Sequence, residues 1–154
     1  MKYYCGIDPG AKGCICFLSE NSDIEFYDYP KKEHEEADYW IMLHNLYTSR
    51  NVVFTVLERV HSMPHQSAQS GFTFGVNYGQ WKMFLQFIQK PYDLVTPQKW
   101  MKSFNIAKAD GKTTKEVVQS VIKRLYPTAD VWGKKGAYKD GRGDSLLISR
   151  YASL

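Results

Sequence analysis

Tyr3-Tyr4-Cys5-Gly6-Ile7-Asp8-Pro9-Gly10, residues 3–10, decides the fold: a run of strand-forming residues ends on an acidic residue and a tight turn. Acidic residues are depleted in buried strands because an unpaired buried carboxylate is costly. Asp8 therefore has two interpretations. It is an ordinary turn residue before Pro-Gly, or it is a carboxylate retained at the end of a central strand for its chemistry.

A second carboxylate, Glu58, closes the apolar run at 52–57, which is typical of a central strand covered by helices on both faces. The alternative interpretation is that Glu58 and its neighbour Arg59 form an ordinary ion pair on the surface at the end of the strand. Carboxylates at the ends of adjacent strands repel each other, and a cation or bound protons must neutralise them. A divalent metal ion is the simplest neutraliser.

A third acidic pair, Asp140 and Asp144, precedes the last apolar segment of the chain. If the final helix begins near Gly141, both carboxylates lie on one side; if it begins later, Asp140 is a cap and only Asp144 faces inward. Hard oxygen ligands select hard cations, and no His or Cys cluster competes. The sequence therefore predicts a Mg²⁺ or Mn²⁺ site made of Asp8, Glu58, Asp144 and Asp140.

Hydrophobic periodicity predicts an α/β domain with a mixed sheet of about five strands flanked by α-helices. We expect strands at 3–7, 14–18, 24–27, 52–57 and 92–95, and helices at 37–48, 75–89, 97–104, 113–126 and 144–154. The segment 59–75 is expected to be a loop. The sequence contains no repeats and no low-complexity linker, so we predict a single domain over 1–154.

The composition is that of a packed domain, with 154 residues, 44% hydrophobic and 15% aromatic. It excludes a disulfide miniprotein and a disordered chain. The three cysteines, Cys5, Cys14 and Cys16, are expected to be buried structural thiols rather than a metal site. No apolar run approaches the roughly 18 residues of a membrane span, and no secretory signal is recognised, so a cytoplasmic protein is expected.

The positive charge lies in the C-terminal part of the chain. Residues 1–96 carry eight Lys and Arg against eleven Asp and Glu, whereas 97–154 carry twelve against five. Such a distribution indicates either a phosphate-binding face or a solvated lysine surface.

The expected helix at 75–89 has apolar residues on two opposite sides. Trp81, Phe84 and Leu85 lie on one side, and Val76, Met83 and Phe87 on the other. The second stripe is either buried between layers or forms a homodimer interface.

Four segments together resemble the RuvC-type Holliday junction resolvases of the RNase H-like superfamily. They are Gly6-Ile7-Asp8-Pro9-Gly10 with Gly13, Leu57-Glu58-Arg59-Val60 with Gln66-Ser67-Ala68, Thr96-Pro97 with Lys102 and Lys115-Glu116-Val117, and Asp140-Gly141-Arg142-Gly143-Asp144-Ser145-Leu146-Leu147-Ile148. The similarity spans residues 3–152. The comparatively short chain resembles the phage-type members, for which the host cytoplasm would be the location.

The resemblance implies an RNase H-like fold and a homodimeric, Mg²⁺-dependent endonuclease. Such an enzyme nicks two opposed strands of a four-way junction symmetrically and leaves 5′-phosphates; cleavage of other branched DNA is a possible extension. By motif position, Asp8, Glu58, Asp144 and Asp140 would bind two metal ions, with Asp8 as the candidate bridge. Lys115 is expected to stabilise phosphate charge, although a solvated first-turn lysine has the same sequence signature.

DNA contacts are expected from exposed cations and from one ring. These residues are Lys102, Lys108, Lys112, Arg59 and Arg142, which would follow the sugar-phosphate backbone, and His61, which would stack at the crossover. Two alternatives remain at this stage. One is an actin-like ATPase or sugar-kinase-type phosphate-binding domain, and the other is a junction-binding protein without activity.

Overall fold

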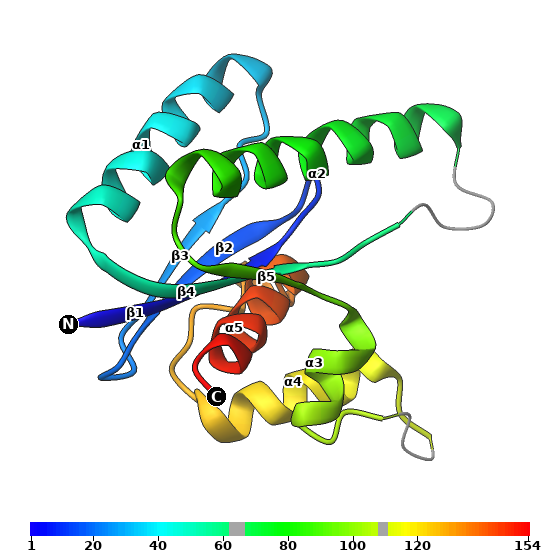
Figure 1. Cartoon of the computed structure of the whole chain (residues 1–154). Helices are drawn as coiled ribbons and strands as arrows, with labels where there is room; N and C mark the ends of the chain where they lie inside the picture. The colour runs from blue at the N-terminus through cyan, green and yellow to red at the C-terminus, as the bar shows by residue number, and fades with distance from the viewer. Residues whose placement is uncertain (62–66, 108–110) are drawn as a thin grey trace.

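A single mixed sheet runs through the centre of the computed structural model, which describes residues 1–61, 67–107 and 111–154. In these ranges five strands lie in the spatial order β3-β2-β1-β4-β5 (Figure 1). They are β1 (Lys2–Asp8), β2 (Cys14–Ser19), β3 (Ile24–Asp28), β4 (Asn51–Glu58) and β5 (Tyr92–Val95). The first three form an antiparallel meander, while β4 and β5 run parallel to β1. The predicted mixed α/β sheet is confirmed.

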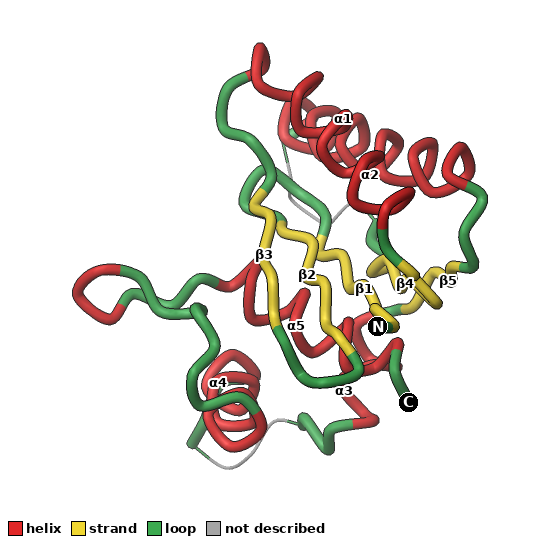
Figure 2. Tube along the Cα trace, turned by 90° about the vertical axis from the view of Figure 1, so that its left-hand side faces the viewer, coloured by secondary structure: helices red, strands yellow, loops and turns green. Residues whose placement is uncertain are grey.

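Helices cover both faces of this sheet (Figures 1 and 2). On one face lie α1 (Glu36–Ser49) and α2 (Ala68–Ile88), each leading into a parallel strand. On the other face lie α3 (Pro97–Ser103), α4 (Thr114–Leu125) and α5 (Asp140–Ala152). Two hydrophobic cores result, one on each side of the sheet.

The side chains of β1 and β2 alternate between these two cores. Cys5 and Phe17 pack under α1 and α2, whereas Cys16 packs under α5. All three cysteines are buried and reduced, and Cys5 lies on the opposite face of the sheet from Cys16. The expectation of structural thiols is therefore consistent with their positions.

Helix α5 lies directly against β1 because Gly6 has no side chain. A Cβ atom at this position would be 2.2 Å from the backbone nitrogen of Ser149 and 2.3 Å from the carbonyl oxygen of Ser145. Backbone atoms on a packed helix cannot move away to make room. Gly6 thus brings the N-terminal part of α5 close to the end of β1.

Helix α2 begins at Ala68, seven residues before the expected start at residue 75, so the expected helix at 75–89 and the loop at 59–75 are corrected. Ser67 starts it: its extended backbone and its side chain, which accepts a hydrogen bond from the Ser70 amide at 3.1 Å, make an N-cap. Gly71 and Gly75 indicated a loop. Both face open space, where each weakens a helix by only about 1 kcal/mol.

Two other helix starts are informative. Helix α5 begins at Asp140 rather than at residue 144, which settles the open alternative and places Asp140 and Asp144 one turn apart. Helix α4 has the predicted capping box, in which Thr113 and Glu116 bond reciprocally. Within the described ranges, no helix has the length and apolar character needed to cross a bilayer.

Candidate active site

Three carboxylates from distant parts of the chain meet at one edge of the sheet. Asp8 is the last residue of β1 and Glu58 the last residue of β4, and these parallel strands are hydrogen-bonded neighbours with Ile7 opposite Leu57. Asp144 comes from the first turns of α5, which packs across β1. The predicted convergence therefore follows directly from the strand register and from the contact at Gly6.

The pKa values report mutual repulsion within this group. Burial raises the pKa of Asp8 well above its usual value, and the negative charges of Asp144, Glu58 and Asp140 raise it further. The pKa of Asp144 rises to about 7, first because of burial and then because of Glu58 and Asp140, while Lys115 opposes the shift. A neighbouring cation is what such a group needs in order to ionise fully.

Glu58 has a dedicated hydrogen-bond partner. The Nε1 of Trp100 on α3 donates to Oε1 of Glu58 at 2.8 Å, and both side chains are buried. Burial raises the pKa of Glu58, and the indole donor counteracts this. The sequence analysis did not identify Trp100. The only signal in the sequence was a large hydrophobic residue whose indole N–H needs a hydrogen-bond acceptor when it is buried, in the short helix after β5.

Asp140 and Lys115 are paired with each other. The Lys115 Nζ donates to Oδ2 of Asp140 at 2.9 Å, and both side chains are more than half exposed. The capping box of α4 sets the position of Lys115 in the first turn of that helix. Lys115 thus lies beside Asp140, whose carboxylate is occupied by this ammonium group, and its expected role at a phosphate stays a prediction.

Tyr138 is a second residue that the sequence did not reveal. Its hydroxyl is buried and has no hydrogen-bond partner among the described residues. Burial raises its pKa, as do the charges of Asp144, Asp140 and Asp8, so the hydroxyl keeps its proton near them. The ring lies over Gly143, where a Cβ atom would overlap the Tyr138 hydroxyl, which explains the glycine at that position.

The carboxylates fit a hard divalent cation in chemistry and charge. Asp8, Glu58 and Asp144 supply oxygen donors, the type that Mg²⁺ and Mn²⁺ prefer. Across the described ranges, however, no three His, Cys, Asp or Glu side chains are already arranged to hold a metal ion. The raised pKa values of Asp8 and Asp144 reflect burial and then repulsion among these carboxyls, which a bound cation would relieve.

The expected DNA-contacting residues lie in different environments. Lys102, Lys112, Arg59 and His61 are exposed, and Lys108 lies outside the described residues. Arg142, by contrast, is already engaged. Its guanidinium donates to Asp28 at 2.7 Å and to Asp130, and it ties α5 to β3.

A basic cleft that sequence reasoning did not anticipate lies beside Asp140. It has a volume of about 290 Å³, and its lining includes Lys12, Lys31 and Lys139 together with the carboxylates of Asp28 and Asp140. These lysines come from three separate segments, so no run of charge in the sequence announced them.

The second apolar stripe of α2 faces outward. The side chains of Val76, Met83 and Phe87 are 47%, 64% and 67% exposed. Burial between the layers of one chain is therefore wrong for these three residues. The homodimer interface stays a prediction.

No protein-family model and no curated protein sequence matches this chain. Solved structures do. The Thermus thermophilus RuvC in complex with a Holliday junction substrate matches over 97% of this chain and 90% of its own, with a TM-score of 0.60 and 11% identity. The Thermus thermophilus RuvC structure matches over 94% and 89%, with a TM-score of 0.54 and 14% identity.

The yeast mitochondrial Holliday junction resolvase Ydc2 matches over 94% of this chain and 75% of its own, with a TM-score of 0.45 and 18% identity. The two Thermus thermophilus structures share the fold of this chain. With the sheet order and the packing of α5 on β1, they show that the chain has the RuvC-type, RNase H-like fold that its motifs predict.

Proposed function

We propose that this protein is a Mg²⁺-dependent endonuclease that resolves four-way DNA junctions by paired, symmetric nicks with 5′-phosphate ends. One observation carries the proposal: Asp8, Glu58 and Asp144 converge at the end of the sheet. Burial raises the pKa of all three, and repulsion by the neighbouring carboxylates raises those of Asp8 and Asp144 further. The fold shared with a RuvC bound to a Holliday junction substrate supports branched DNA as the substrate class.

Asp8, Glu58 and Asp144 would hold the metal ions, with Mn²⁺ able to replace Mg²⁺. Two such ions, when bound, supply positive charge that stabilises the attacked phosphate and the leaving 3′-oxygen. Asp8 interacts electrostatically with both other carboxylates and is the candidate bridge. Trp100 fixes the orientation of Glu58 through its 2.8 Å hydrogen bond.

The cations near the site would receive the DNA backbone. Lys115, held by Asp140 at 2.9 Å, places an ammonium group where charge develops on the phosphate. The basic cleft suits a neighbouring phosphate of the same strand through Lys12 and Lys31, since Lys139 is paired with Asp130 at 2.9 Å. Binding is therefore expected to weaken steeply with salt.

Symmetric nicking needs two active sites, and we propose a homodimer that buries the outer stripe of α2. Val76, Met83 and Phe87 supply an exposed apolar surface on a regular helix. Three buried, reduced cysteines are consistent with a cytoplasmic location.

The test is cleavage of a synthetic four-way junction, compared with three-way and duplex DNA, with Mg²⁺, with Mn²⁺ and with chelator. We expect wild type to cut the junction, Asp8→Asn to bind it without cutting, and Asp38→Asn to cut normally. Asp38 is an exposed carboxylate on α1, across the sheet from α5.

Two outcomes would favour the alternatives. Binding of the junction by wild type without metal-dependent nicks would indicate an inactive junction-binding protein. ATP hydrolysis that Asp8→Asn abolishes, without nicking, would indicate the actin-like phosphate-binding domain.

A further inference from the structure

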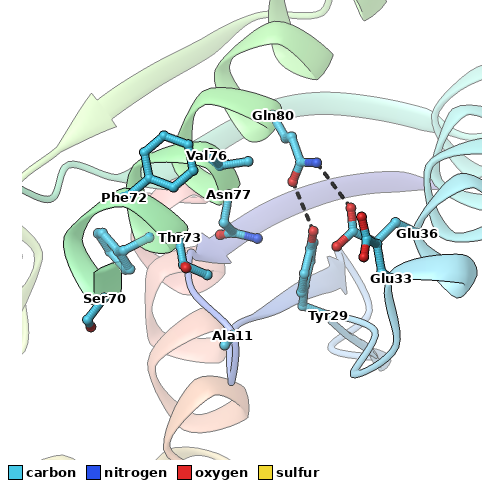
Figure 3. A pocket seen from close by; sticks show the side chains of 11 residues that line it. Ala11, Tyr29, Glu33, Glu36, Ser70, Phe72, Thr73, Val76, Asn77 and Gln80 are labelled. Carbon is cyan, nitrogen blue, oxygen red and sulfur yellow. Dashed lines mark hydrogen bonds between the residues drawn. The ribbon is translucent and has the colours of Figure 1, made fainter. Parts of the chain in front are cut away.

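A cavity of about 570 Å³ lies between α2, the start of α1 and the turn after β1 (Figure 3). Its volume falls in the range of small-molecule sites, roughly 300–1,000 Å³. Ala11 lines it, and Ala11 is three residues beyond Asp8. The cavity therefore lies against the turn that follows Asp8.

The floor of the cavity contains an amide with an unused donor. Asn77 is only 5% exposed, and its Oδ1 accepts a hydrogen bond from the Gly10 amide at 2.7 Å. This bond fixes which end of the amide faces the β1 turn, so Nδ2 faces the Tyr29 side of the cavity, as Figure 3 shows. Nδ2 lies beside the Tyr29 hydroxyl, whose pKa burial raises and this amide lowers, but it makes no hydrogen bond of normal geometry with any described residue. A buried donor of this kind requires an acceptor.

One wall offers acceptors in a fixed arrangement. The Tyr29 hydroxyl donates to Oε1 of Gln80 at 2.9 Å, and Nε2 of Gln80 donates to Oε2 of Glu36 at 3.1 Å (Figure 3). Burial raises the pKa of Tyr29, so its hydroxyl stays protonated and the direction of this chain is set. The carboxylates of Glu36 and Glu33 remain available as acceptors on the same wall.

The opposite wall is apolar and aromatic. Phe72 on α2 lines the cavity with a ring that is 74% exposed, and Val76, at the end of the proposed dimer stripe, lies at its rim. Among the described residues that line it there is no Lys or Arg, whereas there are two carboxylates, Glu33 and Glu36. A phosphate would be repelled by these carboxylates. A flat ring with both a hydrogen-bond acceptor and an amino group would match the amide donor, the carboxylate acceptors and the aromatic wall.

We propose that this cavity takes up one unpaired nucleobase of the branched DNA, and that it selects bases with an exocyclic amino group. The base stacks against Phe72, accepts a hydrogen bond from Asn77 Nδ2 and donates its amino group to Glu36 or Glu33. Adenine, cytosine and guanine carry such an amino group, and thymine does not. The proposal rests on the proposed function, because a branch point in DNA is where a base leaves its pair and its stack at low cost.

The test measures DNA binding without divalent ions, so it does not depend on cleavage. Junctions that carry one unpaired nucleotide at the branch point, either cytosine, thymine or an abasic residue, are titrated by fluorescence anisotropy. We expect wild type to bind the cytosine junction about tenfold more tightly than the thymine or abasic junction. Equal binding of all three would overturn the proposal, even if the nicking assay succeeds.

Variants separate the cavity from general DNA binding. Asn77→Asp keeps the acceptor for Gly10 and removes the donor, and Phe72→Ala removes an exposed ring without disturbing a core. Both are expected to lower the cytosine preference to about one, whereas Ile41→Ala, exposed on α1, keeps it. Retained preference in both cavity variants contradicts the proposal.

Two further measurements test other occupants. Free deoxycytidine is expected not to displace the junction at millimolar concentration; micromolar displacement would assign the cavity to a free nucleoside instead. Both cavity variants are expected to keep the particle mass of wild type in solution. A fall to half that mass in both would assign the cavity to a second copy of the chain.

Discussion

Replacing Asp144 by Asn is expected to stabilise the protein at neutral and higher pH when divalent ions are absent. The Asp144 carboxyl is half-buried, and burial, Glu58 and Asp140 together raise its pKa from 3.8 to about 7. An Asn side chain has nearly the same shape and no charge at any pH. The variant therefore removes the repulsion and leaves the packing of α5 on β1 unchanged.

The sign and the size of this change in the free energy of unfolding follow from the linkage between protonation and folding. Because the folded state raises this pKa, the unfolded chain loses the proton more readily, and the folded state loses stability as pH rises from 3.8 to about 7. Each pKa unit corresponds to about 1.36 kcal/mol, so the full shift corresponds to about 4 kcal/mol above pH 7. Partial exposure reduces this value, and we expect a gain of about 2–4 kcal/mol at about pH 8.

Urea unfolding in the presence of a chelator, followed by tryptophan fluorescence, measures this gain at about pH 8 and at about pH 4. At the lower pH the two proteins are expected to converge, because Asp144 is protonated in the folded state of wild type. Asp38→Asn, on exposed α1, is the control and is expected to change stability by less than about 0.5 kcal/mol. A destabilised Asp144→Asn at pH 8, or an equal gain at both pH values, refutes the reasoning.

Three more variants test other contacts. Trp100→Phe removes the donor to buried Glu58 and is expected to cost about 1–3 kcal/mol in urea unfolding; a cost below about 0.5 kcal/mol contradicts the role of this bond. Gly6→Ala places a Cβ 2.2 Å from the α5 backbone and is expected to cost more than about 3 kcal/mol, whereas Gly71→Ala, in open space on α2, is expected to be neutral or stabilising. Equal effects of the two alanines contradict the close packing. Phe87→Glu is expected to halve the particle mass in sedimentation without unfolding the chain; a monomeric wild type rules out the interface.

The sheet and the carboxylates were predictable because strands obey simple rules. A run such as 52–57 must be covered on both faces, and the residues that end two adjacent parallel strands meet at one edge of the sheet. The proximity of Asp8 and Glu58 follows from these rules alone. Asp144 required one more step, the packing of a helix against Gly6.

The contacts around the carboxylates were not predictable in the same way. Trp100 contacts Glu58, and Tyr138 lies near Asp144. The hydrophobic pattern of the sequence does not determine how the segments that carry these two residues are oriented relative to the sheet. The pairing of Lys115 with Asp140 likewise depends on how α4 and α5 pack. The start of α2 at Ala68 was obscured because Gly71 and Gly75 favour loops, although a single N-cap at Ser67 outweighs them.

Two substitutions in the carboxylate cluster are expected to change the free energy of unfolding in opposite directions. This difference distinguishes a residue kept for metal binding from one kept for packing. Trp100→Phe and Asp144→Asn alter the same cluster, yet the first is expected to weaken the fold and the second to strengthen it. Structural residues do not behave like Asp144, because removing a structural contact lowers stability. Mg²⁺ at a hundred times its dissociation constant would stabilise wild type by about 2.7 kcal/mol and leave Asp144→Asn nearly unaffected. Stabilisation of both proteins by the same amount would place the cation elsewhere, and the repulsion at the end of β1 would then have no role in binding it.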